Sequence, residues 1–185
     1  LWYHTMSPRG WETLLEHLPS GLRRLELVSA KTPLGEEGAR CLAACSKFED
    51  LDVLALSSEG VGDVGFAALA NASFLQSVQD LDVGGNPMGL EGSLALEGAP
   101  LLQGLRELGL SFTEVEDEAI ERLSTFESLQ TLHVLDLSEN ALGDDAARAL
   151  AASPHVSRRE TLSLQQCSVG YDGARALANS AYLGA

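Results

Sequence analysis

The chain contains few cysteines, few aromatic residues and no long apolar run. Three cysteines among 185 residues are too few for a disulfide framework, and aromatic residues make up only 5% of the chain. Cys41 and Cys45 stand one helical turn apart, where side chains bridge poorly. We therefore expect reduced thiols and a cytoplasmic protein. Without an apolar run of about 18 residues or a signal segment, a membrane partner or anchor is not expected.

Basic residues are also scarce. Lysine and arginine number 12 against 27 acidic residues, which gives a net charge of −15. Proteins that bind nucleic acid need a basic face that releases counterions from phosphate, so a nucleic-acid partner is not expected. The apolar content of 45% and charged content of 21% are ordinary for a globular protein, which excludes a disordered chain.

Leucines and small residues recur with one constant period. Four columns of residues keep a step of 27: Leu54, Leu81, Leu108, Leu135 and Leu162; Leu56, Val83, Leu110, Leu137 and Leu164; Gly65, Gly92, Ala119, Ala146 and Gly173; and Leu69, Leu96, Leu123, Leu150 and Leu177. Leu25 and Leu27 begin the first two columns with a step of 29. A fixed period of this size predicts a solenoid of stacked repeats.

Each repeat combines a short strand with a helix. Leucines that alternate along a strand point to one face, and residues 142–156 have apolar side chains at helical spacing. Short connections favour parallel strands, and helices need roughly 8–10 Å of spacing where strands need about 4.8 Å, which curves the stack. The sequence predicts an α/β horseshoe, with a parallel sheet on its concave face and helices on its convex face. We expect one segment over residues 1–185 (a partial repeat 1–21, then six repeats in 22–185) taken from a longer protein.

The repeat units resemble a known family. The strands "LRRLEL", "LDVLAL", "LRELGL", "LHVLDL" and "ETLSL", with helices such as "GDDAARALA", resemble leucine-rich repeats of the ribonuclease-inhibitor-like class and are similar to bacterial tandem arrays. The resemblance implies binding along the concave face and, in many members, a sensor or scaffold role. At the ninth position, where the family usually has Asn or Cys, Asn86, Asn140 and Cys167 keep the pattern, while Ala30, Glu59 and Thr113 depart from it. Arg159 replaces the leucine that should open the sixth strand segment.

Acidic residues gather where helices are expected to begin. There they complement the positive end of the helix dipole and can cap free N–H groups, so we do not interpret them as a metal site. Nine acids share this placement: Glu36, Glu37, Asp63, Glu91, Asp117, Glu118, Asp144, Asp145 and Asp172.

A second acidic group lies on the expected concave face. Strand alternation directs residues between the leucines outward, where eight acids (Glu26, Asp52, Asp80, Asp82, Glu107, Asp136, Glu139 and Glu160) outnumber three arginines, Arg23, Arg24 and Arg106. An acidic groove favours a protein partner with a basic surface, although hydrated strand tops would look the same. We predict a partner-binding set of Arg24, Glu26, Val53, Asp80, Asp82, Glu107, Phe112, His133, Val134 and Asp136, with Phe112, Val53 and Val134 as apolar anchors.

No catalytic constellation accompanies these residues. His133 stands near Asp136, but no nucleophile or third orienting group is placed by the repeat, so a lone surface histidine is preferred. The glycines of "DVGGNPMGLEG" lack a lysine and indicate a turn, and Trp2, Tyr3 and Trp11 indicate core. We expect no enzyme, cofactor or metal, with an activator of small GTPases disfavoured because fold alone confers no chemistry. The leading hypothesis is a non-catalytic recognition module. The alternative is a structural, sensor or autoinhibitory arm of a larger protein such as a nucleotide-dependent switch.

Overall fold

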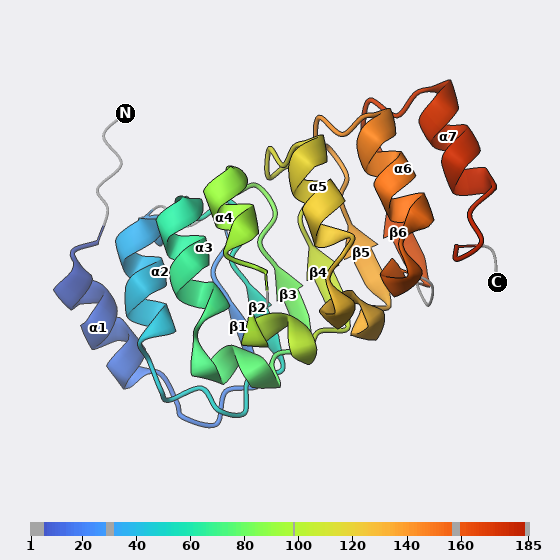
Figure 1. Cartoon of the computed structure of the whole chain (residues 1–185). Helices are drawn as coiled ribbons and strands as arrows, with labels where there is room; N and C mark the ends of the chain where they lie inside the picture. Colours follow the sequence, from blue (N-terminus) through green and yellow to red (C-terminus); the bar gives the residue numbers. More distant parts are fainter. Residues whose placement is uncertain (1–5, 29–31, 98, 157–159, 184–185) are drawn as a thin grey trace.

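Six short strands form one parallel sheet in sequence order. The computed structural model describes residues 6–28, 32–97, 99–156 and 160–183. Within these residues, neighbouring strands in the chain are also neighbours in the sheet (Figure 1). The strands are β1 (Arg24–Glu26), β2 (Val53–Ala55), β3 (Asp80–Asp82), β4 (Glu107–Gly109), β5 (Val134–Asp136) and β6 (Thr161–Ser163).

The pairing register follows the sequence period. Val53 pairs with Asp80, Asp80 with Glu107, and Glu107 with Val134, so each step is 27 residues. Arg24 pairs with Val53, a step of 29, as the two extra residues before β2 require. The predicted period and the parallel α/β solenoid are therefore confirmed.

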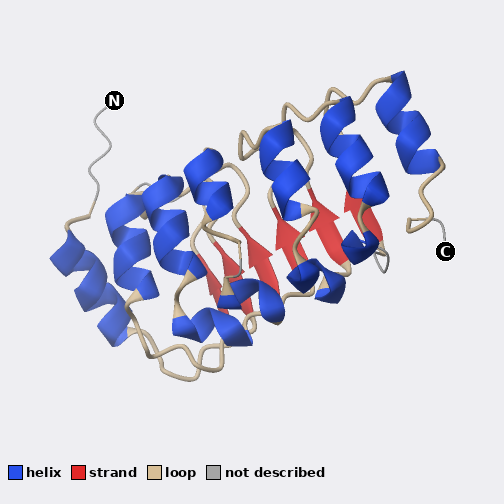
Figure 2. Ribbon diagram, in the orientation of Figure 1, coloured by secondary structure: helices blue, strands red, loops and turns tan. Residues whose placement is uncertain are grey.

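Helices form a second layer on one side of the sheet. They stand in a row with α1 and α7 at its two ends, while the strands lie behind them (Figures 1 and 2). The helices are α1 (Pro8–His17), α2 (Gly35–Ala43), α3 (Gly62–Ala70), α4 (Leu90–Leu94), α5 (Asp117–Leu123), α6 (Asp144–Ala152) and α7 (Tyr171–Ala178).

Within the part of the chain that the structure describes, four short 3₁₀ helices return it from the helical layer to the next strand. They are η1 (Ser73–Ser77), η2 (Pro100–Gln103), η3 (Glu127–Thr131) and η4 (Pro154–Val156). The sequence predicted one helical face over 142–156, which is wrong in detail, because α6 ends at Ala152. Pro154 cannot continue the α-helical hydrogen bonding, and the Ser153 hydroxyl donates to the Ser124 carbonyl of the previous repeat.

The core lies between the sheet and the helices. Leucines at the strand centres, such as Leu54 and Leu135, are fully buried, and the small helical residues Gly65 and Ala146 are buried as well. Trp11 is 3% exposed on α1 and belongs to the same core, as predicted. Four residues that the sequence analysis names lie outside the described residues: Trp2, Tyr3, Ala30 and Arg159.

An asparagine ladder joins successive repeats through their turns. The Asn86 amide nitrogen donates to the Leu56 carbonyl of the previous repeat at 2.7 Å, and its oxygen accepts from the Glu59 backbone N–H at 2.9 Å. Asn140 repeats these bonds with Leu110 at 2.8 Å and Thr113 at 2.9 Å. The ladder satisfies buried backbone groups that the short strands leave unpaired.

A second set of bonds joins successive helices. Asp63 accepts from the backbone N–H of Gly89 at 2.8 Å, and equivalent bonds of 2.7 Å join Asp117 to Gly143 and Asp144 to Gly170. We call these three pairs the Asp–Gly clasps. The acids were expected to cap N–H groups, but the N–H groups that these three cap begin the helix of the next repeat rather than their own.

Two further properties bear on function. No helix within the described ranges is long and apolar enough to cross a membrane. Cys41, Cys45 and Cys167 are free thiols, and burial raises the pKa of the Cys41 thiol, with the nearby Glu12 and Glu37 carboxylates adding to the shift.

Candidate binding surface on the parallel sheet

The sheet face turned away from the helices carries two rows of outward side chains. We call this the concave face. Its first row follows the first residue of each strand and its second row follows the third, with buried leucines between them. The first row is Arg24, Val53, Asp80, Glu107, Val134 and Thr161, and the second row is Glu26, Ala55, Asp82, Gly109, Asp136 and Ser163.

Two acids meet at the centre of the first row. Asp80 and Glu107 are register partners on β3 and β4, flanked by Val53 on β2 and Val134 on β5. Like charges directly opposite each other in a sheet repel. Burial raises the pKa of Asp80, and the Glu107 carboxylate raises it further, while Arg24 acts in the opposite direction. This central pair therefore favours a bound cation or a proton.

The acids of the second row have a different role. Asp82 accepts from the Gly84 backbone N–H at 2.9 Å and from the Ser57 hydroxyl at 2.7 Å. Asp136 accepts from the Ser138 backbone N–H at 2.9 Å and from the Ser138 hydroxyl. Both carboxylates thus hold the turns that follow their strands. The sequence treated them as equal members of the acidic groove, whereas much of their acceptor capacity is used within the fold.

Ion pairs neutralise the acids near β1. Arg24 lies 2.6 Å from Glu26, and Arg23 lies 2.6 Å from Asp52. By contrast, within the described parts of the chain, Asp80 and Glu107 have neither an ion pair nor a side-chain hydrogen bond. Among the strand residues of the two rows, the acids without an ion pair or a side-chain hydrogen bond are therefore concentrated at the β3–β4 step.

Phe112 lies beyond the end of β4. Its side chain is 60% exposed, and its backbone has a left-handed φ of +52° while its N–H donates to the Ser138 carbonyl at 2.9 Å. The same backbone position has positive φ in each repeat where it is described: Ser58, Gly85, Phe112, Glu139 and Gln166. A bulky residue is disfavoured in this conformation, so the fold itself gives no reason for an aromatic side chain here.

His133 immediately precedes β5. Its Nδ1 lies 3.1 Å from the Thr131 carbonyl oxygen, so the ring is oriented by its own turn. Over the described residues, no hydrogen bond joins His133 to Asp136, and no group of three or more His, Cys, Asp or Glu side chains could hold a metal ion. What these residues offer chemically is charge and contact area.

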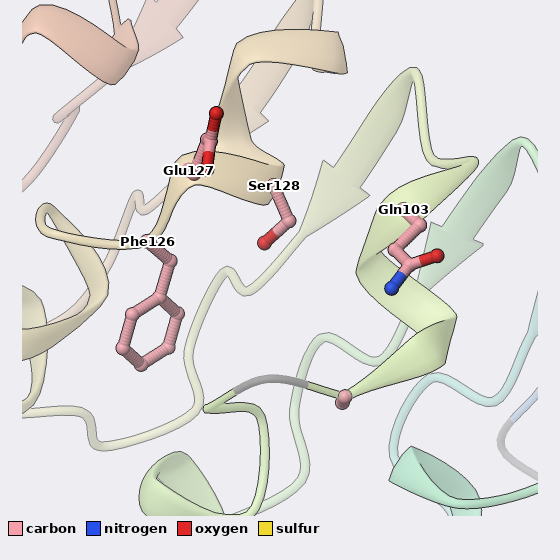
Figure 3. Close-up of a pocket in the computed structure, with 5 residues that line it drawn as sticks. Gln103, Phe126, Glu127 and Ser128 are labelled. Atoms are coloured by element: carbon pink, nitrogen blue, oxygen red, sulfur yellow. The ribbon is translucent and has the colours of Figure 1, made fainter.

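Two cavities of about 380 Å³ lie on the helical side. A cavity of about 380 Å³ is lined by Ala99, Gln103, Phe126, Glu127 and Ser128, with Gln103 on η2 facing the Phe126 and Ser128 side of the space (Figure 3). None of its lining residues belongs to the concave rows. The residues of the concave rows are all exposed or half-buried, so this face is a solvent-accessible surface, which suits a macromolecular partner better than a small molecule.

The comparison with protein-family models agrees with this architecture. The family model described as Leucine Rich repeat matches residues 128–151. A crystal structure of a TLR13–ssRNA13 complex is similar over 93% of this chain, with 18% identity and a TM-score of 0.49, and this chain spans 26% of that chain. No curated protein matches the chain. The matched repeat and the six-stranded register together define an α/β leucine-rich repeat solenoid.

Proposed function

We propose that this protein is a non-catalytic recognition module that binds a basic protein surface on its concave face, centred on Asp80 and Glu107. The observation that carries the proposal is the like-charged pair across β3 and β4, whose two carboxylates form no ion pair among the described residues. A folded protein gains nothing from opposing two carboxylates in this way. A bound lysine or arginine removes that repulsion and gains two charge-assisted hydrogen bonds.

The neighbours of the pair indicate what kind of cation fits. Adjacent strands are about 4.8 Å apart, so a single ammonium or guanidinium group can contact both carboxylates. Val53 and Val134 continue the row on either side and offer apolar contact to the aliphatic part of such a side chain. Phe112 adds an exposed aromatic ring beyond the end of β4. Together these groups fit a lysine or arginine within a protein surface.

Several broader assignments accompany the proposal. The 27-residue alternation of strand and helix supports the ribonuclease-inhibitor-like class of repeats. A net charge of −15 supports a protein partner over a nucleic acid, although the similar TLR13 chain is in complex with ssRNA13. We propose that this module is cytoplasmic and joined to further domains, and that it has neither a cofactor nor enzymatic activity.

A double variant of the full chain that replaces both central carboxylates with neutral amides tests the proposal. D80N/E107Q removes both central charges while keeping side-chain size, and E12Q/D172N removes the same number of charges from exposed positions on α1 and α7. The probe is a hexalysine peptide, titrated by calorimetry at about 0.15 M salt to screen distant surface charges. We expect D80N/E107Q to weaken binding at least fivefold and E12Q/D172N to change it less than twofold. Equal effects of the two variants would contradict the proposed site.

A further inference from the structure

Among the described junctions between repeats, one lacks the side-chain hydrogen bonds that join the others. It lies between β3–α4 and β4–α5, and we call it the α4–α5 joint. At β1–β2 the Glu59 carboxylate takes the place of the ladder asparagine and accepts from the Leu34 backbone N–H at 2.9 Å. Among junctions between described strands, the α4–α5 joint alone has neither a bond from its ninth-position side chain to the previous repeat nor an Asp–Gly clasp. Three substitutions of the repeat pattern account for this: Thr113, Leu90 and Glu116.

Thr113 replaces the ladder asparagine. Its hydroxyl donates to the Leu110 carbonyl of its own repeat at 2.8 Å and lies 3.4 Å from the Asn140 amide oxygen of the following repeat. An asparagine reaches back to the preceding repeat, as Asn140 does to Leu110. The threonine side chain is shorter along that direction, so no side-chain bond crosses to the β3 repeat.

Leu90 and Glu116 replace the two members of a clasp. Leu90 stands 27 residues after Asp63 and has no acceptor atom, and Glu116 stands 27 residues after Gly89. A Cβ on Gly89 would lie 2.8 Å from Asp63 Oδ2, so the clasp needs glycine on its donor side. Glu116 has that Cβ, and the joint has therefore lost both the acceptor and the space for it.

The helical layer is open at the same place. Helix α4 has five residues, whereas α3 and α6 have nine each. Three cavities follow one another along the joint. Their volumes are about 380, 170 and 380 Å³, and Figure 3 shows the first of them. Phe126 lines both of the larger cavities, and Glu118 lines the smallest cavity and one of the larger ones. Leu90 remains 42% exposed beside the smallest cavity.

The sheet, by contrast, is continuous across the joint. Asp80, Leu81 and Asp82 pair with Glu107, Leu108 and Gly109, and the Met88 backbone N–H donates to the Thr113 carbonyl at 2.7 Å. The paired strands β3 and β4 can therefore act as an axis about which the two repeats rotate, so that helices α4 and α5 move apart or together. In a solenoid the interface between neighbouring repeats sets local stability, so a weaker interface opens at a lower free energy.

We propose that the α4–α5 joint is a conformational hinge, and that the angle between its two repeats is coupled to the concave-face pair Asp80–Glu107. This inference rests on the proposed function, because the pair spans the same two strands as the joint. Repulsion between the carboxylates favours a wider concave side at β3–β4. A cation bound between them removes the repulsion, draws the concave side together and separates α4 from α5. Partner binding thus changes the curvature of the solenoid at one defined place.

Installing the missing clasp tests the hinge without any ligand. In the full chain, L90D/E116G supplies an acceptor and a glycine donor while keeping the number of carboxylates constant. We expect amide hydrogen exchange at 86–94 and 113–123 to slow at least fivefold and the Tm to rise. L90D alone should not do this, because the Glu116 Cβ still blocks the approach. D63L/G89E, the reverse change at the preceding junction, should accelerate exchange there.

Wild-type protein gives the comparison that does not depend on any variant folding. Exchange at the α4–α5 joint should be at least fivefold faster than at the junctions with Asp63–Gly89 and Asp117–Gly143. Equal protection at all three junctions, or an unchanged rate in folded L90D/E116G, would overturn the hinge.

Coupling to the concave face requires a second measurement. Hexalysine should change exchange at the joint in the wild type and change it less than half as much in L90D/E116G. If hexalysine fails to bind at Asp80 and Glu107, the proposed function fails while the ligand-free exchange still decides the hinge. If hexalysine binds there and exchange at the joint is the same with and without it, the coupling is overturned and the binding site stands.

Discussion

The side-chain oxygen of Asn86 accepts a hydrogen bond from the backbone N–H of Glu59 at 2.9 Å, and its amide N–H donates to the Leu56 carbonyl at 2.7 Å. Both partners belong to the previous repeat, and the asparagine is buried. Each repeat is too small to satisfy its own turn, so one side chain supplies the missing donor and acceptor. The stability of the stack therefore depends on contacts that cross from one repeat to the next.

Replacing Asn86 with alanine should be strongly destabilising. It leaves several buried backbone groups without a partner, which costs about 2–4 kcal/mol of the free energy of unfolding. Urea denaturation followed by circular dichroism measures the change. Asn71 is the matched control, because its amide donates to the Ala67 carbonyl at an exposed helix end, and N71A should stay within about 0.5 kcal/mol of wild type. Similar effects of the two variants would contradict the ladder.

The clasp between Asp117 and Gly143 should be sensitive to a single methyl group. A Cβ on Gly143 would lie 3.1 Å from the Asp117 carboxylate, although the extended backbone at Gly143 accepts any residue. G143A should therefore destabilise the protein by about 1–2 kcal/mol through overpacking. The control is G21A, where a Cβ meets nothing within 4 Å. Thermal melts of both variants check this, and a neutral G143A would show that the clasp contributes nothing.

Phe112 should be expendable for folding. A left-handed backbone costs about 1–2 kcal/mol for a residue with a Cβ, and glycine avoids this cost. Glycine instead loses about 0.5–1 kcal/mol through the greater conformational entropy of its unfolded chain. The free energy of unfolding of F112G should thus equal that of the wild type or exceed it by about 1 kcal/mol. Glu139 has the same backbone at φ +58° and provides the control variant E139G. If F112G were destabilised by about 2 kcal/mol or more and E139G were not, Phe112 would be a packing residue.

The raised pKa of Asp80 predicts a pH-dependent stability difference. Burial and the Glu107 carboxylate raise the pKa of Asp80 above its ordinary value of 3.8, so the folded state holds this proton more tightly than the unfolded state. The stabilising contribution is complete below pH 3.8 and is lost as the pH rises through the folded-state pKa. D80N should therefore be more stable than wild type at neutral pH, and the difference should shrink in acid. Urea titrations across this pH range measure it. A D80N variant less stable than wild type at neutral pH would contradict the assignment.

The repeat architecture could be predicted because it depends on columns of single residue types. Leucines at a step of 27 fix which face of each strand is buried, and the register follows from the same step. Asn86 and Asn140 also stand out at fixed positions in the sequence. These features require no knowledge of how far apart neighbouring repeats lie.

The hydrogen-bond partners of the acids could not be predicted in the same way. A carboxylate near a helix start is equally compatible with capping its own helix, and only the close packing of helices directs Asp117 toward Gly143. Likewise, Asp82 and Asp136 point outward from their strands but bind the following turns. A signal for the clasps was present, because glycine follows the acid by 26 residues at Asp63, Asp117 and Asp144.

The most direct test of recognition by the Asp80–Glu107 pair locates a bound cation on the surface of the folded chain. Hexalysine titrated into protein with labelled valine methyl groups should shift the NMR resonances of Val53 and Val134, which flank the central acids. Val64, exposed on α3, should remain unshifted. In D80N/E107Q the shifts of Val53 and Val134 should disappear. Shifts confined to the helical side, or shifts at Val53 and Val134 that persist without the two charges, would contradict recognition by this pair.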